Sequence, residues 1–307
     1  MMPQALNIEH KPISRRERKS KNIWLKLAKN FKFLPSKWFV KLAYQAATGQ
    51  TVDFSNPITF NEKIQWYKVY YKNPLLKTLA NKYLVREYVK EKIGEEYLNG
   101  LIAIYRNPKE IDFSKLPDQF ALKVVHGSGY NIIVSDKSKL DQDKARKRLA
   151  KWQRTNFYLK NREWAYKNSP RLIIAEEFLS EAGKEVISDY KFFCFNGQVK
   201  FVQVDVDRKI DHTRSFYDTN WQKLPFFNVE NRWTSDEIEK PSNYDEMVEV
   251  ARKLSEGLPF VRVDLYALNG KTYFGEMTFY PANGTKFFSP DEWNTTIGSY
   301  FVLPPKS

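Results

Sequence analysis

The stretch that most constrains the fold of this chain runs from Val261 to Gly284, with the sequence VRVDLYALNGKTYFGEMTFYPANG. β-Branched and aromatic residues on both sides of an Asn-Gly pair are typical of a β-hairpin. Each arm of this hairpin nevertheless carries a carboxylate, Asp264 in the first arm and Glu276 in the second. Unpaired charges are seldom buried, so either these side chains face water or a cation lies between them.

The length of the hairpin loop decides between these alternatives. A two-residue turn of Asn269 and Gly270 places the two carboxylates on opposite faces, because successive side chains of a strand alternate. A three-residue loop that begins at Leu268 instead brings four polar residues onto one face, namely Arg262, Asp264, Glu276 and Thr278. Two acids and a hydroxyl on one face suit Mg²⁺ that is bridged to phosphate oxygens. A magnesium site therefore predicts the three-residue loop.

The composition excludes several classes of protein. The chain has 307 residues, of which 42% are hydrophobic and 16% aromatic, so it is long and apolar enough for a globular core. Its single cysteine, Cys194, excludes an internal disulfide framework and a multi-cysteine zinc site. No stretch approaches the roughly 18 apolar residues of a membrane span, and the N-terminus lacks the apolar core of a signal peptide. We therefore expect a soluble, cytoplasmic protein.

The formal charge of +14 is concentrated in two segments. Residues 1–50 contain eleven Lys and Arg against two acids, and residues 136–171 contain twelve against four. Such basic segments favour polyanions, whether nucleic acid, anionic lipid or an acidic polysaccharide. Charge alone does not choose among these three partners.

The order of the expected elements indicates an α+β protein with helices first. Expected helices cover residues 23–31, which either dock on the core or lie on a membrane surface, then 59–71 with a Thr59–Glu62 capping box, 81–94, 139–159 and 243–257. Expected strands cover 120–135, interrupted by a glycine turn, then 171–179, and 189–207 with a hairpin at Asn196-Gly197.

One candidate anion site follows the strand that contains Lys123. The turn after this strand contains Gly127 and Gly129, and glycines allow successive backbone N–H groups to face an anion. A phosphate cradle and an ordinary glycine hairpin with a solvated lysine are both compatible with this segment.

Further charged residues lie on the expected strands. Glu176 and Glu177 end a strand, where they either receive the base and ribose of a nucleotide or form a solvated edge. Lys191 shares a strand face with buried residues and so needs an anionic partner, for which phosphate is one candidate. Asp205 and Asp207 form an Asp-x-Asp tripeptide, which is either a plain strand end or a metal and sugar-nucleotide site.

Together these segments resemble the ATP-grasp superfamily, and specifically the teichuronopeptide-biosynthesis (TupA-like) ATP-grasp family, whose members are often labelled polysaccharide-biosynthesis glycosyltransferases. The resemblance covers about residues 35–300 in order. The segments that carry it are NPITFNEKIQWYK, NKYLVREYVKEKIGEEYL, LPDQFALKVVHGSGYNIIVSDKS, IIAEEFL, DYKFFCFNG, VRVDLY and YFGEMTFYPANG.

The resemblance implies an ATP-grasp fold, in which two α+β subdomains grip ATP behind a helical N-terminal region. It implies a basic arm and helical region over residues 1–80, a small subdomain with the glycine-rich flap over 81–180, and a large subdomain with the metal-binding hairpin over 181–307. The nucleotide or phosphate contacts that it implies are Lys82, Lys123 and Lys191, with a flap of Gly127, Ser128 and Gly129 and an adenine-binding hinge of Glu176, Glu177, Phe178 and Leu179.

The resemblance also implies Mg²⁺ ligands at Asp264, Glu276 and Thr278, and a catalytic role for Arg262 and Lys191 in stabilising the transferred charge. Two positions depart from the family pattern. The flap has Gly129-Tyr130 where the family usually has two glycines, and Thr278 replaces a common asparagine, whose amide carbonyl is the stronger ligand.

The implied reaction is phosphoryl transfer from ATP to a carboxylate, followed by attack of an amine on the acyl phosphate. The implied partners are an acidic glycan or its lipid-linked precursor and an amine such as an amino acid, with peripheral contact to anionic membrane at its inner face and no nucleic acid. Three alternatives remain open from the sequence: a sugar-nucleotide glycosyltransferase that uses Asp205 and Asp207, an ATP-dependent sugar kinase, and a non-enzymatic nucleic-acid- or membrane-binding module.

Overall fold

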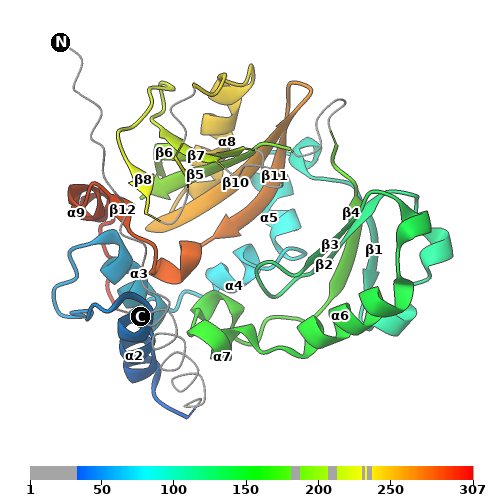
Figure 1. Ribbon diagram of the computed structural model, residues 1–307, viewed down its shortest axis with the longest axis horizontal. Coiled ribbons are helices and arrows are strands. Elements are labelled where there is room, and N and C mark those ends of the chain that lie inside the picture. Colours follow the sequence, from blue (N-terminus) through cyan, green and yellow to red (C-terminus); the bar gives the residue numbers. More distant parts are fainter. Residues whose placement is uncertain (1–32, 181–186, 207–212, 230–231, 234–236, 307) are drawn as a thin grey trace.

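Two largely antiparallel β-sheets form the two halves of the protein (Figure 1). The computed structural model describes residues 33–180, 187–206, 213–229, 232–233 and 237–306, so the expected basic arm and the helix expected over residues 23–31 lie outside the described residues. The four-stranded sheet has the order β1-β4-β2-β3, and the six-stranded sheet has the order β11-β10-β5-β6-β7-β9. Helices accompany both sheets, which confirms the expected α+β fold class.

The strands of the first sheet are β1 (Leu101–Tyr105), β2 (Phe120–Val124), β3 (Asn131–Val134) and β4 (Ile173–Glu177). Those of the second are β5 (Asp189–Phe195), β6 (Gln198–Val206), β7 (Thr213–Tyr217), β9 (Arg232–Trp233), β10 (Phe260–Leu268) and β11 (Lys271–Thr278). A small separate pair consists of β8 (Phe227–Asn228) and β12 (Phe288–Ser289). The hairpin expected at Asn196-Gly197 is confirmed, with positive φ at both residues.

The α-helices are α2 (Ser36–Thr48), α3 (Phe60–Tyr70), α4 (Leu75–Leu79), α5 (Val85–Lys92), α6 (Gln142–Arg154), α7 (Phe157–Asn161), α8 (Tyr244–Ser255) and α9 (Glu292–Tyr300). The expectation of one continuous helix over 139–159 is wrong. Helix α6 ends at Arg154, and the side chain of Asn156 caps α7 as a separate helix by accepting from the backbone N–H of Leu159. Within the described part of the chain, no helix is long and apolar enough to cross a bilayer.

The two faces of the six-stranded sheet have opposite characters because side chains alternate along each strand. One face carries apolar residues such as Val263 and Phe192, and α8 packs beside β5, β6 and β10 with its own buried residues Met247 and Leu254. The other face carries a charged region and an aromatic region. Ring contacts join the aromatic region to Phe60 of α3. At one end the charged region lines a cavity together with residues of α7, and at the other end it lines a cavity together with residues of α3.

Helix α3 begins where the sequence predicts. The hydroxyl of Thr59 accepts from the backbone N–H of Glu62 at 3.3 Å, and the Glu62 carboxylate accepts from the backbone N–H of Thr59 at 2.9 Å. This reciprocal pair is the expected capping box, which satisfies two N–H groups at the start of the helix. It fixes the first residue of a helix whose later turns contact the candidate active site.

The hairpin of β10 and β11 places its acids on one face by a different route from the one predicted. The turn is the simple two-residue one, with Asn269 at φ 51° and Gly270 at φ 73°, so the three-residue loop is wrong. A β-bulge at Gly275 shifts the register instead, and beyond it Asp264 lies directly opposite Glu276. The four polar residues therefore share one face even though the turn is short, because one extra residue in β11 changes the parity of the pairing.

We predict that Gly275→Ala destabilises the protein by about 1–3 kcal/mol, because overpacking forces the backbone to move. A Cβ atom at this position would lie 2.9 Å from the carbonyl oxygen of Asp264 and 3.0 Å from the Tyr266 ring. Urea unfolding measures the effect. The exposed Lys271 on the same strand supplies the control, since Lys271→Ala should change stability by no more than about 0.5 kcal/mol. Equal stability of the Gly275→Ala variant and the wild type would contradict this account of the bulge.

Candidate active site

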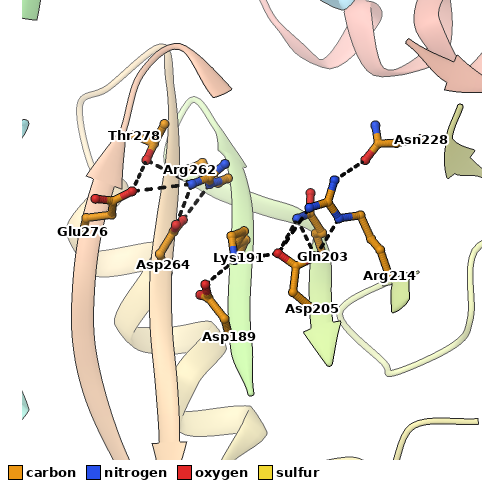
Figure 2. A network of polar contacts seen from close by, with 10 residues as sticks. All are labelled: Asp189, Lys191, Gln203, Asp205, Arg214, Asn228, Arg262, Asp264, Glu276 and Thr278. Carbon is orange, nitrogen blue, oxygen red and sulfur yellow. Dashed lines mark hydrogen bonds and ion pairs between the residues drawn. The ribbon is translucent and has the colours of Figure 1, made fainter. Parts of the chain in front are cut away.

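A network of charged side chains crosses five adjacent strands on one face of the larger sheet (Figure 2). The register explains why these residues meet. Asp264 lies opposite Glu276 on one side and opposite Lys191 on the other, and Lys191 in turn lies opposite Gln203. Asp205 and Arg214 extend the network onto the next strand pair. The pairing of adjacent strands thus brings together residues that lie as far apart in the sequence as positions 189 and 278.

The hairpin end of the network is centred on the Arg262 guanidinium. It contacts both carboxylate oxygens of Asp264 at 2.6 Å and donates to the Thr278 hydroxyl at 3.1 Å. Its Nη2 atom lies 3.8 Å from the Glu276 carboxylate, which also lies 3.2 Å from the ammonium of Lys82. The negative charges of two carboxylates are thus balanced by the positive charges of Arg262 and Lys82 in this part of the site.

These contacts set the ionisation of the acids. Burial raises the pKa of Asp264, and the bidentate contact with Arg262 opposes that rise. Burial acts in the same direction on Glu276, but the charges of Lys82 and Arg262 outweigh it and lower its pKa to about 2. Glu276 is therefore a carboxylate throughout the neutral range, which is the form that binds a metal ion.

The other end of the network surrounds Asp205, whose side chain is buried. Lys191 lies 2.8 Å from this carboxylate and also pairs with Asp189. Arg214 donates to Asp205 at 2.6 Å and to Asn228 at 2.9 Å. Burial alone would raise the pKa of Asp205, but the nearby Lys191 and Arg214 lower it well below its usual range. The expected anionic partner of Lys191 is thus supplied by protein carboxylates.

A cavity of about 260 Å³ lies between the hairpin and the segment around α7, and it is called the first cavity below. Four of the residues proposed from the sequence line it, namely Ser128 of the flap and Arg262, Glu276 and Thr278 of the hairpin. Lys82 joins these two parts, since its ammonium donates to the carbonyl oxygen of Gly127 at 2.9 Å while it contacts Glu276. Gly129, at φ 73°, provides the left-handed residue of the flap turn.

Some of the remaining proposed residues line two other cavities, whereas Asp264 lines neither of these nor the first cavity. Lys191 lines a second cavity of about 140 Å³ together with Arg214 and Asn228, and Arg262 lies in the walls of both cavities. Lys123 and Glu176 line a third, of about 10 Å³, where their side chains pair at 2.5 Å. The structure therefore does not gather the proposed nucleotide contacts into one cavity.

The expected adenine hinge already uses part of its hydrogen-bonding capacity within the protein. The backbone N–H of Glu177 donates to Gly100, and its carbonyl oxygen accepts from the Asn99 side chain. Glu176 contacts Arg86 at 3.4 Å as well as Lys123. The next two hinge residues, Phe178 and Leu179, follow the end of β4 and are only partly buried.

The turn after β11 adopts an unusual backbone. Ala282 and Asn283 have φ values of 48° and 58°, a left-handed conformation that costs a non-glycine residue about 1–2 kcal/mol. Polar residues on one face of α3 hold this turn. Lys68 donates to the Asn283 carbonyl oxygen at 2.7 Å, and Gln65 donates to those of Asn283 and Gly284 at 3.0 and 2.8 Å. Helix α3 thereby fixes one wall of the first cavity.

The donor set fits the magnesium ion that the sequence predicts. Within the described ranges, no group of three or more His, Cys, Asp and Glu side chains could hold a metal ion. Mg²⁺, however, is usually bound by one or two carboxylates together with substrate phosphates and water. Asp264 and Glu276 provide two carboxylates on one face, and Thr278 adds a hydroxyl 3.3 Å from Glu276.

A family model supports the relationship that the motifs indicate. The model described as TupA-like ATPgrasp matches residues 62–302, which is more than half of the chain. The chain belongs to the TupA-like ATP-grasp family. This assignment bears out the expected ATP-grasp fold. The individual site residues stay predictions.

Several solved structures are similar to this ATP-grasp chain. The D-alanine–D-alanine ligase from Bacillus anthracis is 14% identical, with a TM-score of 0.41 over 67% of this chain and 59% of that one. The corresponding ligase from Helicobacter pylori is 17% identical, with a TM-score of 0.39 over 74% and 61%. The ATP-grasp ligase PsnB, complexed with a phosphomimetic variant of minimal precursor, Mg and ADP, is 12% identical, with a TM-score of 0.40 over 78% and 64%.

The chain thus spans less than two thirds of the length of each of these proteins. Similarity at this level carries no argument about activity or substrate. No curated protein matches the chain.

Sequence reasoning missed several residues at the site. Lys160, Asn161 and Glu163 line the first cavity, although the sequence places the first two near or beyond the end of a charged helix. Segment 136–171 contains four acids and twelve basic residues, and Glu163 is one of these four acids. An acid in so basic a segment was the signal that could have drawn attention to Glu163. Lys68 was missed because a lysine on a helix is normally solvated, whereas this one is buried.

We predict that Asp205→Asn destabilises the protein by about 3–5 kcal/mol at pH 7, because it leaves two buried cations without their shared carboxylate. The lowered pKa of Asp205 contributes stability that is fully present above the unfolded value of about 3.9 and is lost as the pH falls below it. As the pH is lowered, the free energy of unfolding of the variant should therefore fall less steeply than that of the wild type. Chemical unfolding between pH 7 and pH 3 measures both effects.

Asp118→Asn is the matched control, because Asp118 is 91% exposed and lies 3.8 Å from Lys137. An exposed pair contributes about 0–1 kcal/mol, so this variant should resemble the wild type. An Asp205→Asn variant as stable as the Asp118→Asn variant would refute the structural role of the buried network.

Proposed function

We propose that this ATP-grasp protein is an ATP- and Mg²⁺-dependent ligase that joins a carboxylate to an amine through an acyl phosphate. The observation that carries the proposal is the convergence of Asp264, Glu276 and Arg262 on one face of the hairpin, with Arg262 and Glu276 in the wall of a cavity. This arrangement combines ligands for a divalent cation with a fixed positive charge, which is the combination that phosphoryl transfer requires.

The residues of this chain would act mainly by position and charge. Asp264, Glu276 and Thr278 would hold Mg²⁺, which neutralises phosphate charge when it is bound. Arg262 lies in the walls of both the first and the second cavity, so its guanidinium can face a phosphoryl group as that group moves between two substrates. Phosphorylation turns the oxygen of a carboxylate into a good leaving group, and no covalent enzyme nucleophile is needed. The buried Cys194 then belongs to the core, where burial raises its pKa to about 12.

The substrates that we propose are an acidic glycan, with a uronic acid as the carboxylate, and an amino acid as the amine. The net charge of +14 supports an acidic substrate, since a strongly basic protein attracts polyanions. We place the enzyme in the cytoplasm, at the inner face of the membrane, where a lipid-linked glycan precursor is accessible.

A glycosyltransferase that holds a sugar nucleotide through Asp205 and Asp207 is the competing proposal. Both oxygens of Asp205 accept hydrogen bonds from Gln203, and the same carboxylate pairs with Lys191 and Arg214. Three side chains thus engage the Asp205 carboxylate, whereas among the described residues the hydrogen-bond donor to Asp264 is Arg262. Asp207 lies outside the described residues. A sugar kinase would share the ATP site and differ in forming no acyl phosphate.

We predict that the protein, with ATP, Mg²⁺ and oligosaccharides of glucuronate or galacturonate, forms ADP and, when hydroxylamine is added, a hydroxamate. Hydroxylamine traps acyl phosphates, so this product distinguishes a ligase from a sugar kinase. Asp264→Asn and Glu276→Gln should each lower hydroxamate formation by about 10²–10³-fold, the loss typical of removing one electrostatic contact to a transition state. Coupled detection of ADP and the ferric hydroxamate colour measure the two products.

The exposed Asp118→Asn variant is the control for these assays and should keep full activity. Circular dichroism establishes that the site variants remain folded. Full activity of both site variants would refute the metal assignment. Release of UDP from a UDP-sugar without consumption of ATP would refute the ligase in favour of the glycosyltransferase.

A further inference from the structure

Glu163 is a buried acid in the wall of the first cavity. It follows α7, is only 6% exposed, and lines the same cavity as Arg262, Glu276 and Thr278. Among the described residues, the donor that the structure gives its carboxylate is the Asn161 side chain, 3.1 Å from Oε1. One hydrogen bond leaves most of the accepting capacity of a buried carboxylate unused.

A buried carboxylate in this position calls for a cation. Lys68 of α3 acts on Glu163 by its charge, but its ammonium is hydrogen-bonded to Gln65 at 2.9 Å and to Asn283. Burial raises the pKa of Glu163, and the charges of Lys68 and Lys160 oppose the rise. Lys68 thus supplies countercharge, but among the described residues it donates no hydrogen bond to Glu163, so this carboxylate can still accept from an ammonium group.

The other groups around Glu163 suit an ammonium ion. Tyr166 and Tyr280 line the same cavity, and the pKa values of both are raised by burial and by the Glu163 charge. Aromatic faces attract cations, and a carboxylate flanked by rings is a common way to bind an amine. A cavity of about 260 Å³ also far exceeds the roughly 10–15 Å³ that one water molecule needs.

We propose that Glu163 binds the ammonium group of the amine substrate and takes a proton from it as the amine attacks the acyl phosphate. This inference rests on the proposed function and assigns the second substrate to the wall formed by Glu163, Tyr166 and Tyr280. The substrate class is a primary amine. Arg262 and Glu276 line the same cavity, so the phosphate and the amine would share this space.

The step balances in atoms and charge. Glu163 removes one proton from the ammonium, and the nitrogen lone pair forms a bond to the acyl carbon. The bond from that carbon to the phosphate oxygen breaks, and both of its electrons leave with phosphate. The second N–H proton of the new linkage departs with inorganic phosphate, and the proton on Glu163 passes to solvent. Positioned acids and bases of this kind contribute about 10²–10⁴-fold to a rate.

The test compares two nucleophiles in the full-length protein. An amino-acid mixture presents ammonium groups at neutral pH, whereas hydroxylamine is uncharged there and needs neither an anionic partner nor prior deprotonation. With ATP, Mg²⁺ and uronate oligosaccharides, Glu163→Gln should lower amide formation from the amino-acid mixture by about 10²-fold or more while hydroxamate formation stays within about threefold of wild type. Mass spectrometry measures the amide, and the ferric hydroxamate colour measures the trapped product.

Glu87→Gln is the matched control, because Glu87 is an exposed glutamate on α5 and should behave as wild type. If Glu163→Gln does not fold, Glu163→Asp replaces it, since it keeps the charge but withdraws it by one methylene. Amide formation should again fall more than hydroxamate formation.

A parallel loss of both products, or no loss of either, would overturn the role of Glu163 and leave the proposed ligase intact. Failure of the wild type to form hydroxamate at all would instead contradict the proposed function itself.

Discussion

The buried pair of Arg262 and Asp264 is the interaction on which the site depends. Their side chains are 12% and 5% exposed and meet through two contacts of 2.6 Å. Removing one partner of such a buried ion pair costs about 3–5 kcal/mol, because the other charge is left unpaired in a region of low dielectric constant. The pair can form beside Glu276 only because the bulge at Gly275 changes the parity of β11. The bulge thus brings Glu276 onto the face of this pair, and Arg262 lines both of the larger cavities.

Helix α3 connects this sheet to the N-terminal part of the chain. Its residues Asn61, Gln65 and Lys68 follow helical spacing and are all at most 3% exposed. They donate to carbonyl oxygens between Asn283 and Lys286, more than two hundred residues away in the sequence. Hydrogen bonds from a charged group contribute about 1.5–3 kcal/mol, enough to offset the left-handed backbone there. The segment NPITFNEKIQWYK therefore holds the turn that follows β11, beside the proposed metal-binding residues.

Local features of this fold could be predicted from the sequence, because their causes are local. The Thr59 capping box, the Asn196-Gly197 hairpin and the strands beside Gly127 depend on neighbouring residues only. The bulge could not be predicted, since it depends on how Gly275 fits against the backbone of the partner strand. The surroundings of Glu163 could not be predicted either, because α3, α7 and the turn after β11 meet there only in the folded chain. The shared face of Asp264 and Glu276 was predicted from the chemistry of a metal site, but the predicted three-residue loop was wrong, because the bulge produces this face instead.

The central claim is that this site activates a carboxylate by phosphorylation, and transfer of an oxygen isotope tests it most directly. The uronate substrate is labelled with ¹⁸O in its carboxyl group and converted with ATP, Mg²⁺ and an amino acid. An acyl phosphate intermediate predicts that one ¹⁸O atom appears in inorganic phosphate for each amide formed, because the carboxylate oxygen leaves with the phosphoryl group. Amide formation with unlabelled phosphate, or label retained on a phosphorylated sugar, would contradict the claim.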